Sequence, residues 1–578
     1  MNKEISELLY QIAELLSFSK ENLFRVRAYE NAARVIESYP RDIEELVKNN
    51  ELKEIPGIGK SIEEKITEYL STGRLKYLDE LKKEIPEGLL DIMNIPGMGP
   101  RKTKIVYENL KITSIKELET AARNGKLRNI SGFGEKTEEN VLSGIQLQQK
   151  LRGRMLLFEA LNLADTIMKE IKKNKEVKQV SPAGSLRRLK ETVRDIDILC
   201  TVKKNKEKYI IDRFTNLPIV DKVLAAGTTK ASVISKEGVQ IDLRVLEELC
   251  YGAALQYFTG SKEHNIALRE LANRKGFTIN EYGVFKISKS GPPPSPSGKS
   301  VAGRTEEEIY ALLGLRFIPP MLRENRGEIE SSMDGRLPQL INLTEVRGDT
   351  HVHSKYSDGV NTIEEIADKA EKLGYEWVII CDHSQSLKIA DGVSLKDMYR
   401  KIDYINRLNQ KNPGIKILAG TEVDILSDGK LDYPDELLKE LDFVNAAVHT
   451  GFKQEEEQIT TRIIRAMENK YVHCISHLTG RLIGKREPYK INIEKVLQSA
   501  RDTGTVLEIN AFPERLDLSD VYCKRAKEMG IKMCIGSDAH SIGQMEYLPL
   551  GVYVAQRGWL EKNDVINTMN YKELKTEV

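Results

Sequence analysis

The chain has few cysteines and no long apolar segment. Its six cysteines are dispersed, mostly within apolar runs, and form no CxxC pair. This usage is typical of reduced core residues rather than of a disulfide framework. No apolar stretch reaches the ~20 residues that cross a bilayer, and the N-terminus MNKEISELLY lacks a signal peptide's apolar core. We therefore expect a cytoplasmic protein without membrane segments.

A strong net charge is also absent, since 88 Lys and Arg residues stand against 87 Asp and Glu residues. The chain as a whole is therefore not drawn to nucleic acid, and any such binding must come from local patches. The composition is that of an ordinary soluble protein. A chain of 578 residues exceeds what one hydrophobic core can hold, so we expect several domains.

Histidine is scarce as well, but its distribution is uneven. Seven of the eight histidines lie in the C-terminal two-fifths, and six of those occur near acidic residues just after apolar runs. Imidazole and carboxylate groups bind zinc, manganese and iron, and nine such groups exceed what one cation can use. The sequence therefore predicts more than one metal. The nine candidate ligands are His351, His353, Asp358, His383, Glu422, His449, His477, Asp538 and His540.

Most of these ligands follow segments that are typical of buried strands, at 377–381, 415–419, 443–448 and 533–536. Such runs alternate with helical patterns like 362–373, which indicates βα units around a parallel sheet. In barrels of this kind, active sites lie at the C-terminal ends of the strands. His473 precedes the last apolar residues before His477, so we interpret it as structural.

With all nine positions matched, this part of the chain resembles the polymerase and histidinol phosphatase (PHP) family. The resemblance implies a distorted seven-fold βα barrel with two or three Mn²⁺, Zn²⁺ or iron ions. Clustered cations lower the pKa of bound water and neutralise phosphate oxygens, so we expect an active phosphoester hydrolase. The implied ligand sets are His351, His353, Glu422 and Asp538; Glu422, His449 and His477; and Asp358, His383 and either Asp538 or His540.

A weak internal repeat occupies the first 150 residues, with copies IPGIGK at 55–60, IPGMGPRK at 95–102 and ISGFGEK at 130–136. One such motif is usually a plain turn between helices. Three copies, each before a helical pattern, resemble helix-hairpin-helix elements, which bind the DNA backbone without reading sequence. The third copy has Ser131 for proline and Glu135 beside the hairpin, which weakens its match. The candidate DNA-binding residues are Gly57, Gly59, Gly97, Gly99, Gly132 and Gly134.

Paired carboxylates form a second candidate site, with Asp195 and Asp197 flanking Ile196 in a β-branched run. Alternation along a strand places both carboxylates on one face, where they repel each other unless cations lie between them. Asp242 occurs in a similar run. Three carboxylates on adjacent strands could hold two Mg²⁺ ions, the arrangement that supports phosphoryl transfer. The alternative is a solvated strand edge.

The segment from about 151 to 318 resembles the family X DNA polymerases of the polymerase beta type. The match rests on four features of the sequence. They are the Gly184-Ser185 pair, which predicts a turn, the paired aspartates Asp195 and Asp197, YFTGS at 257–261 and GFTINEY at 276–282. The resemblance implies that Asp195 and Asp197 bind both Mg²⁺ or Mn²⁺ ions and that Asp242 activates the primer 3′-hydroxyl. Lys262 and His264 depart from the family, which leaves base contacts there open. The implied nucleotide-binding residues are Gly184, Ser185 and Arg188 at the triphosphate, Tyr257, Phe258 and Gly260 at the sugar, and Asn265 at the base edge.

The same resemblance makes the N-terminus a DNA-end-binding domain. Some family members use a lysine there as a Schiff-base nucleophile against a 5′-deoxyribose phosphate. Lys65 matches that position, but Ser61 replaces a nearby family lysine. Glu63 and Glu64 would favour the charged amine, whereas a nucleophilic lysine needs a depressed pKa. We therefore favour a solvated lysine and keep Lys65 as the candidate lyase residue.

We expect a multidomain α/β protein with helical helix-hairpin-helix domains, an α+β palm and thumb of the nucleotidyltransferase type, and a distorted (βα)7 PHP barrel. The Pro-Ser-Gly-rich stretch at 288–300 predicts a hairpin tip inside the thumb. The expected divisions are 1–85 (lyase-like), 86–150 (second hairpin unit), 151–248 (palm), 249–320 (thumb), 321–346 (linker) and 347–578 (barrel).

The combined patterns predict a DNA repair enzyme with two active sites. Its polymerase half would fill short gaps from deoxynucleoside triphosphates, and its barrel would process 3′ ends, with abasic-site cleavage as a further activity. Its partners would be gapped or nicked DNA and 3′ ends, and we expect a monomer. One alternative is an end-processing phosphoesterase whose polymerase half mainly binds DNA. Another is a non-catalytic DNA-end scaffold.

Overall fold

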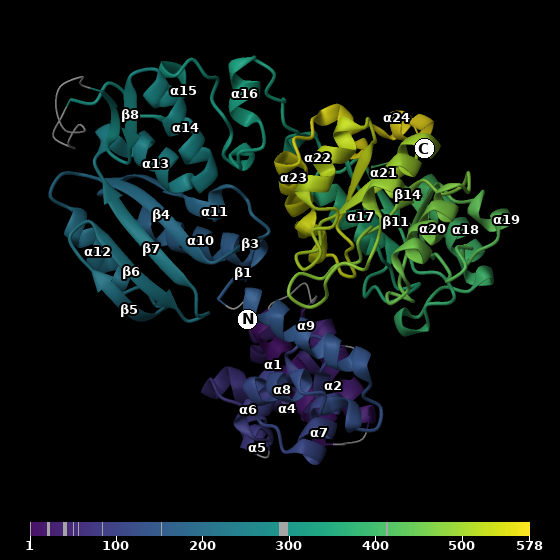
Figure 1. Ribbon diagram of the computed structural model, residues 1–578. Coiled ribbons are helices and arrows are strands. Elements are labelled where there is room, and N and C mark those ends of the chain that lie inside the picture. The colour runs from purple at the N-terminus through teal and green to yellow at the C-terminus, as the bar shows by residue number, and fades with distance from the viewer. Residues whose placement is uncertain are drawn as a thin grey trace.

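The computed structural model describes residues 2–19, 23–37, 43–49, 51–55, 57–83, 85–151, 153–287, 299–411 and 414–577. Pro56 of the first hairpin and most of the expected hairpin tip, residues 288–298, lie outside these ranges. Figure 1 shows an N-terminal helical unit, a palm and thumb beside it, and a C-terminal barrel. Among the described residues, no helix combines the length and apolar character needed to span a membrane.

Over its described residues, the N-terminal unit contains helices and no strand, and its one hydrophobic core extends from Ile5 to Ile145. The core therefore crosses the expected division between residues 85 and 86. Each glycine repeat precedes a helix, as the sequence predicts. The helices are α1 (Asn2–Ser19), α2 (Leu23–Glu37), α3 (Ile43–Lys48), α4 (Lys60–Thr72), α5 (Lys76–Lys83), α6 (Glu87–Met93), α7 (Gly99–Leu110), α8 (Ile115–Arg123) and α9 (Glu135–Leu151).

The palm is a five-stranded sheet in the order β2-β4-β7-β6-β5. Helices α10 (Leu157–Lys172) and α12 (Glu207–Thr215) contribute apolar side chains to the same core as the sheet. Strands β4 and β7 run parallel with Asp197 opposite Asp242, so the register brings the expected carboxylates together. The strands are β2 (Val177–Pro182), β4 (Asp195–Val202), β5 (Val220–Ala226), β6 (Lys230–Ser235) and β7 (Gln240–Leu246), and β1 (Met155–Leu156) pairs with β3 (Thr192–Val193) at the side.

The thumb comprises α13 (Tyr251–Thr259), α14 (Lys262–Arg274), the hairpin of β8 (Phe277–Asn280) and β9 (Gly283–Lys286), and α15 (Glu306–Leu312). An antiparallel bridge joins Val284 to Ala302, which lie on either side of the Pro-Ser-Gly-rich stretch in the sequence. The expected linker contains α16 (Glu328–Met333), and its Leu322 and Ile329 belong to the thumb core. Trp559 of the barrel completes that core, so the segment is packed between thumb and barrel.

The C-terminal domain is a seven-stranded parallel sheet whose strands follow chain order from β10 to β16. Backbone bonds near its two ends, such as Asp538 N–H to His351 O at 2.9 Å, nearly close it into the expected barrel. The strands are β10 (Gly348–Val352), β11 (Trp377–Ile380), β12 (Lys416–Asp424), β13 (Phe443–Ala447), β14 (Cys474–Ile475), β15 (Val506–Asn510) and β16 (Met533–Gly536).

Helices cover the outside of the barrel (Figure 1). Helix α17 begins where Thr362 and Glu365 form a capping box, which satisfies backbone N–H groups at its first turn. The helices are α17 (Ile363–Lys372), α18 (Leu395–Lys411), α19 (Asp435–Leu438), α20 (Glu456–Met467), α21 (Ile493–Thr503), α22 (Asp520–Glu528), α23 (Leu548–Arg557) and α24 (Tyr571–Glu577).

Candidate active sites in the barrel and the palm

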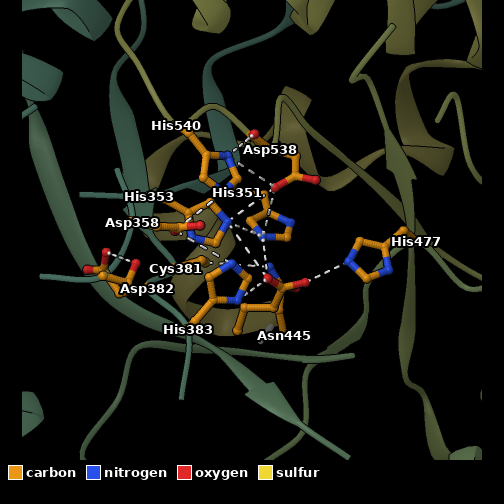
Figure 2. A network of polar contacts seen from close by, with 12 residues as sticks. His351, His353, Asp358, Cys381, Asp382, His383, Asn445, His477, Asp538 and His540 are labelled. Carbon is orange, nitrogen blue, oxygen red and sulfur yellow. Dashed lines mark hydrogen bonds and ion pairs between the residues drawn. The ribbon is translucent and has the colours of Figure 1, made fainter. Parts of the chain in front are cut away.

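The nine expected barrel ligands converge at one end of the parallel strands. His351 lies near the end of β10, Glu422 near the end of β12, and Asp538 just after β16. Figure 2 shows the rings of His351, His353, His383 and His540 turned toward one another. This arrangement follows from the parallel order, because the C-terminal ends of all strands meet on the same side of a barrel.

Glu422 occupies the middle of this cluster and is almost fully buried. Its Oε1 lies 2.8 Å from His477 Nε2 and 3.4 Å from His449 Nε2. Its Oε2 lies 3.0 Å from His383 Nδ1 and 3.5 Å from His351 Nε2. The carboxylate therefore has ligand-type nitrogens on both of its oxygens, as a bridging ligand would.

The other ligands surround His353, whose Nε2 lies 3.2 Å from Asp538 Oδ1 and 3.1 Å from His351 Nε2. Asp358 Oδ1 lies 3.4 Å from His540 Nε2 and 3.7 Å from His383 Nε2. The sets compact enough to hold an ion are His353, Asp358, His383 and His540; His351, His353 and Asp538; and His383, Glu422 and His449. These sets differ from the expected ones, because His353 and His383 each belong to two sets, Glu422 belongs to one, and His477 belongs to none.

Cations fit this donor set because several buried ligand atoms lack hydrogen bonds. Within the described residues, His353 Nδ1, Asp358 Oδ1, His383 Nδ1 and both oxygens of Glu422 have no hydrogen-bond partner. Leaving buried polar atoms unsatisfied is costly, so an arrangement of this kind calls for a group that binds lone pairs. The converging imidazoles and carboxylates are the chemistry that Mn²⁺, Zn²⁺ and iron bind.

Burial and neighbouring charges strongly shift the pKa values in this cluster. Burial, with the nearby rings of His540 and His383, lowers the pKa of His353 to about 3. Burial alone would raise the pKa of Glu422, but His449, His351 and His383 hold it well below its usual range. Burial opposes protonation of His449, yet Glu422 and Asp424 raise its pKa to about 9. The cluster thus favours ionised carboxylates.

The structure adds supporting residues that the sequence analysis did not identify. Glu508 Oε1 lies 2.6 Å from His351 Nδ1, and Asp424 Oδ1 lies 2.5 Å from His449 Nδ1. Carboxylates on the second ring nitrogen fix the tautomer and orientation of a metal-binding histidine. Arg515 Nε lies 3.2 Å from Asp538 Oδ2. Asp424 lies in β12 and Glu508 in β15, and both are buried. An acidic residue inside an apolar strand is the sequence feature that could have identified them.

In the palm, Asp195, Asp197 and Asp242 lie together on the paired strands β4 and β7. Burial, together with repulsion from Asp195 and Asp242, raises the pKa of Asp197 to about 6. A divalent cation bound here would relieve the part of this shift that comes from the neighbouring carboxylates. Lys230 Nζ, 3.5 Å from Asp242 Oδ2, offsets part of that charge.

Gly184 lies against this carboxylate group. A Cβ built on Gly184 would lie 2.6 Å from Asp197 Oδ2, and its φ of +61° belongs to the left-handed region. Both observations require glycine here. Ser185, in the same short helix α11 (Gly184–Arg187), is partly exposed beside it.

Arg188 is held between palm, thumb and connector. Its Nη1 donates to Thr259 O at 2.5 Å, and its Nε donates to Glu324 Oε1 at 3.0 Å. The residues expected at the sugar lie near Thr259. The Tyr257 and Phe258 ring centres are 5.1 Å apart, and Gly260 lies beside Arg188. The Asn265 amide donates to Tyr257 O at 2.7 Å.

His264, where the sequence departs from the polymerase pattern, is fully buried. Its Nδ1 lies 2.6 Å from Glu328 Oε1 and its Nε2 lies 3.0 Å from the Tyr310 hydroxyl. These contacts place the ring in the thumb core. Lys262 begins α14 and is exposed.

The three glycine hairpins have a common conformation. Gly57, Gly97 and Gly132 have φ values of +87°, +85° and +85°, and a Cβ on any of them would meet open space. The same open space surrounds Gly59, Gly99 and Gly134. A phosphate could therefore approach the backbone of each hairpin. Lys65 lies on α4, where its amine donates to Ser61 Oγ at 2.9 Å and lies 4.6 Å from the Tyr77 ring centre.

Four family models match parts of this architecture. The description "helix-hairpin-helix domain" matches residues 1–75, and "SAM-like helix-hairpin-helix tandem" matches residues 89–146. "DNA polymerase beta thumb" matches residues 254–324, and "PHP domain" matches residues 349–512.

The chain is 37% identical over 575 residues to the "DNA polymerase/3′-5′ exonuclease PolX" of Bacillus subtilis (strain 168), covering 99% of this chain and 98% of that protein. The chain belongs to the PolX family. This membership confirms the family resemblances given above for the polymerase half and the barrel together.

The barrel alone has shorter relatives. A probable phosphatase of Thermoanaerobacter sp. (strain X514) is 34% identical over 235 residues, which cover 38% of this chain and 89% of that protein. A probable phosphatase of Acetivibrio thermocellus is 31% identical over 202 residues, 33% of this chain and 78% of that protein. The barrel fold thus also occurs without a polymerase half.

Proposed function

We propose that this PolX family member extends DNA 3′ ends at the palm and hydrolyses them in the 3′ to 5′ direction at the barrel, with short gaps as its substrate. The observation that carries the proposal is the presence of two complete and separate ligand groups in one chain. Asp195, Asp197 and Asp242 form one group, and the cluster around Glu422 forms the other. The full-length likeness to the Bacillus enzyme supports the same pair of activities.

In the palm, Asp195 and Asp197 would hold Mg²⁺ or Mn²⁺, which when bound would neutralise the phosphates of the incoming nucleotide. Asp242 stands opposite Asp197 and would accept the proton of the primer 3′-hydroxyl. The Gly184 turn lies against Asp197, and Ser185 and Arg188 follow it in the chain, so these residues would bind the triphosphate. Arg188 would have to exchange its bond to Glu324 for a phosphate oxygen.

In the barrel, the nine clustered residues would hold two or three Mn²⁺, Zn²⁺ or iron ions, which when bound would supply a nucleophilic water. Glu508 and Asp424 would orient His351 and His449 through their second ring nitrogens. Hydrolysis that breaks the bond between phosphorus and the 3′-oxygen leaves a 3′-hydroxyl on the shortened strand. That hydroxyl is the group that the palm extends, so one centre prepares the substrate of the other.

The proposal is tested with a 5′-labelled primer on a gapped duplex, with Mn²⁺ or Mg²⁺, in the presence or absence of nucleotides. Asp242→Ala should lower extension by about 100-fold or more because the general base is lost, while 3′ shortening persists. His449→Ala should lower 3′ shortening by about 100-fold or more while extension persists. The reason is that loss of a residue that binds the metal directly should cost more than the ~10–100-fold that follows loss of a residue supporting such a ligand.

Two matched variants serve as controls. Asp221→Ala removes an exposed aspartate from β5 of the palm, and His473→Asn removes the barrel histidine outside the cluster. Both should retain wild-type extension and shortening near pH 7.5. Wild-type extension by purified Asp242→Ala would refute the assignment of the palm, and wild-type shortening by His449→Ala would refute that of the barrel.

A further inference from the structure

A cavity of about 620 Å³ opens onto the barrel cluster and is built from three parts of the chain. Asp358, Asp538 and His540 of the cluster form one end. Phe158 of palm helix α10 and Tyr10 of N-terminal helix α1 contribute to the same wall. Cavities of this size hold small organic ligands, so the entrance can enclose a terminal nucleotide.

Aromatic rings concentrate in this cavity. The Phe158 and Tyr547 rings are 4.9 Å apart, and the Phe512 and Tyr547 rings are 5.7 Å apart, both in edge-to-face packing. All three side chains are partly exposed, and each lines the cavity. Aromatic side chains that line a cavity and are partly exposed can contact a planar ligand there.

The pairing of strands β15 and β16 brings Phe512 close to the ligand Asp538. Phe512 follows β15 by two residues and Asp538 follows β16 by two residues, and the last residues of the two strands, Asn510 and Gly536, are paired. The Asn510 amide donates to Asp538 Oδ2 at 3.1 Å, and Asn510 Oδ1 accepts from the Phe512 N–H at 3.1 Å. One asparagine therefore connects a ring of the cavity with a ligand of the cluster.

A positively charged side chain adjoins the cluster in this cavity. Arg515 lines the same cavity and pairs with Asp538. Among the described residues, its buried Nη1 atom has no hydrogen-bond partner. A guanidinium with a free donor suits a phosphate oxygen. One cavity thus contains both a guanidinium that can bind a phosphate and a group of aromatic rings.

We propose that Phe158, Phe512 and Tyr547 form a stacking subsite for the 3′-terminal base of the strand that the barrel hydrolyses. The proposal rests on the proposed 3′ hydrolysis and specifies the substrate as a strand whose last nucleotide carries a base. Stacking is tolerant of sequence because every base has a π face. Because Phe158 belongs to the palm, the polymerase half supplies part of the hydrolase's substrate site.

The test compares two single-stranded oligonucleotides that differ only at the 3′ end, one with a normal terminal nucleotide and one with a tetrahydrofuran abasic analogue. The measured quantity is the ratio of kcat/KM for the two ends, with Mn²⁺ as the added metal. The wild-type protein should favour the base-bearing end by roughly tenfold or more. Phe158→Leu, which keeps apolar volume but removes the ring, should lower this ratio by roughly fivefold or more without slowing hydrolysis of the abasic end.

Matched variants separate stacking from packing. Phe158→Tyr keeps the ring and should retain the wild-type ratio. Tyr209→Leu removes an exposed aromatic ring from palm helix α12 and should also leave the ratio unchanged. Primer extension by Phe158→Leu at the wild-type rate should show that the palm is folded.

The outcomes distinguish this inference from the proposed function. If the wild-type protein hydrolyses neither end, the assignment of the barrel fails and the subsite with it. If the wild-type protein hydrolyses both ends equally well, only the stacking subsite is refuted. If Phe158→Leu slows both ends by the same factor, the ring acts in packing between palm and barrel, and the proposal is overturned.

Discussion

Single residues in both centres are constrained by charged side chains that lie close to them. Gly184 contacts Asp197 so closely that no side chain fits, and Asp197 itself is pushed toward protonation by burial and by Asp195 and Asp242. In the barrel the effect is reversed, because the histidines around Glu422 keep this buried carboxylate ionised. In the palm, bound cations would offset the cost of crowding like charges.

We predict that Gly184→Ala lowers primer extension by roughly tenfold or more, because its Cβ would lie 2.6 Å from Asp197 Oδ2 and displace that carboxylate. The matched variant is Gly238→Ala in the turn before β7, which has a φ of +78° but open space around its Cβ position. Both variants carry a backbone strain of about 1–2 kcal/mol, so their thermal stabilities should be similar. Equal extension rates in the two variants would show that the contact with Asp197 is unimportant.

His473 provides a pH-dependent prediction outside the metal cluster. Burial lowers the pKa of His473 to about 4, and its Nδ1 accepts the Val444 N–H at 3.0 Å. The unfolded chain, with an ordinary histidine pKa near 6.5, binds more protons than the folded chain between about pH 6.5 and 4. This histidine therefore costs no stability above about pH 6.5 and destabilises the fold by up to roughly 3 kcal/mol as pH falls through that window.

His473→Asn keeps an acceptor for Val444 but does not titrate. The free energy of unfolding of this variant, measured by denaturant at several pH values, should fall less steeply between about pH 6.5 and 4 than that of the wild type. Identical slopes for the two proteins would mean that folding does not lower the pKa of His473.

At this scale, residue type and spacing predicted which side chains gather in the barrel. Eight of the nine expected ligands belong to the compact sets, and the ninth, His477, contacts Glu422. The supporting residues could not be predicted in the same way. Glu508 meets His351 across 157 residues of chain, and Arg515 meets Asp538 only because neighbouring strands align. Such pairs depend on strand register, which the local sequence does not specify.

Among the elements, the apolar runs located the barrel strands well but not always their ends. Strand β16 covers Met533–Gly536, as expected, whereas β12 extends from Lys416 to Asp424. Gly420, Thr421 and Glu422 lie within β12 because they pair with β13 residues Phe443, Val444 and Asn445. Polar residues inside a strand carry no periodic signal when both faces are buried.

The hairpins give a prediction at this scale. Gly59→Val should weaken binding to gapped DNA by a similar factor on any sequence, because Gly59 has an ordinary φ of −83° and its side chain would project into open space where a phosphate would lie. The slope of log affinity against log salt should become shallower by about 1 for each phosphate that the hairpin no longer binds. A titration on two unrelated gap sequences at several salt concentrations measures both effects.

Gly134→Val is the matched variant, since Gly134 also has open space but Glu135 opens the following helix α9. The carboxylate opposes a phosphate, so we expect a smaller loss of affinity and a smaller change of slope. If Gly59→Val keeps the wild-type slope, or weakens binding on only one sequence, the first hairpin is a structural turn.

In the whole molecule, the palm, the connector and the barrel meet at a group of buried charges. Arg557 of α23 donates to Arg188 O at 2.7 Å, to Glu324 at 3.1 Å and to Asp520 at 2.6 Å. Glu324 also accepts from Arg188, the residue expected at the triphosphate. The sequence predicted each domain separately, but contacts such as this one join residues 369 positions apart and could not be foreseen from local pattern.

We predict that Arg557→Met destabilises the protein by roughly 3 kcal/mol, because it leaves Glu324 and Asp520 buried without their shared cation. The KM for the incoming nucleotide should rise several-fold, since Glu324 would then hold Arg188 more strongly, while 3′ hydrolysis persists. Arg336→Met removes an exposed arginine paired with Asp334 and should change neither quantity. Thermal unfolding and nucleotide titration of extension measure the two effects. If Arg557→Met unfolds like the wild type and keeps its KM, the charged junction neither stabilises the molecule nor acts on the nucleotide site.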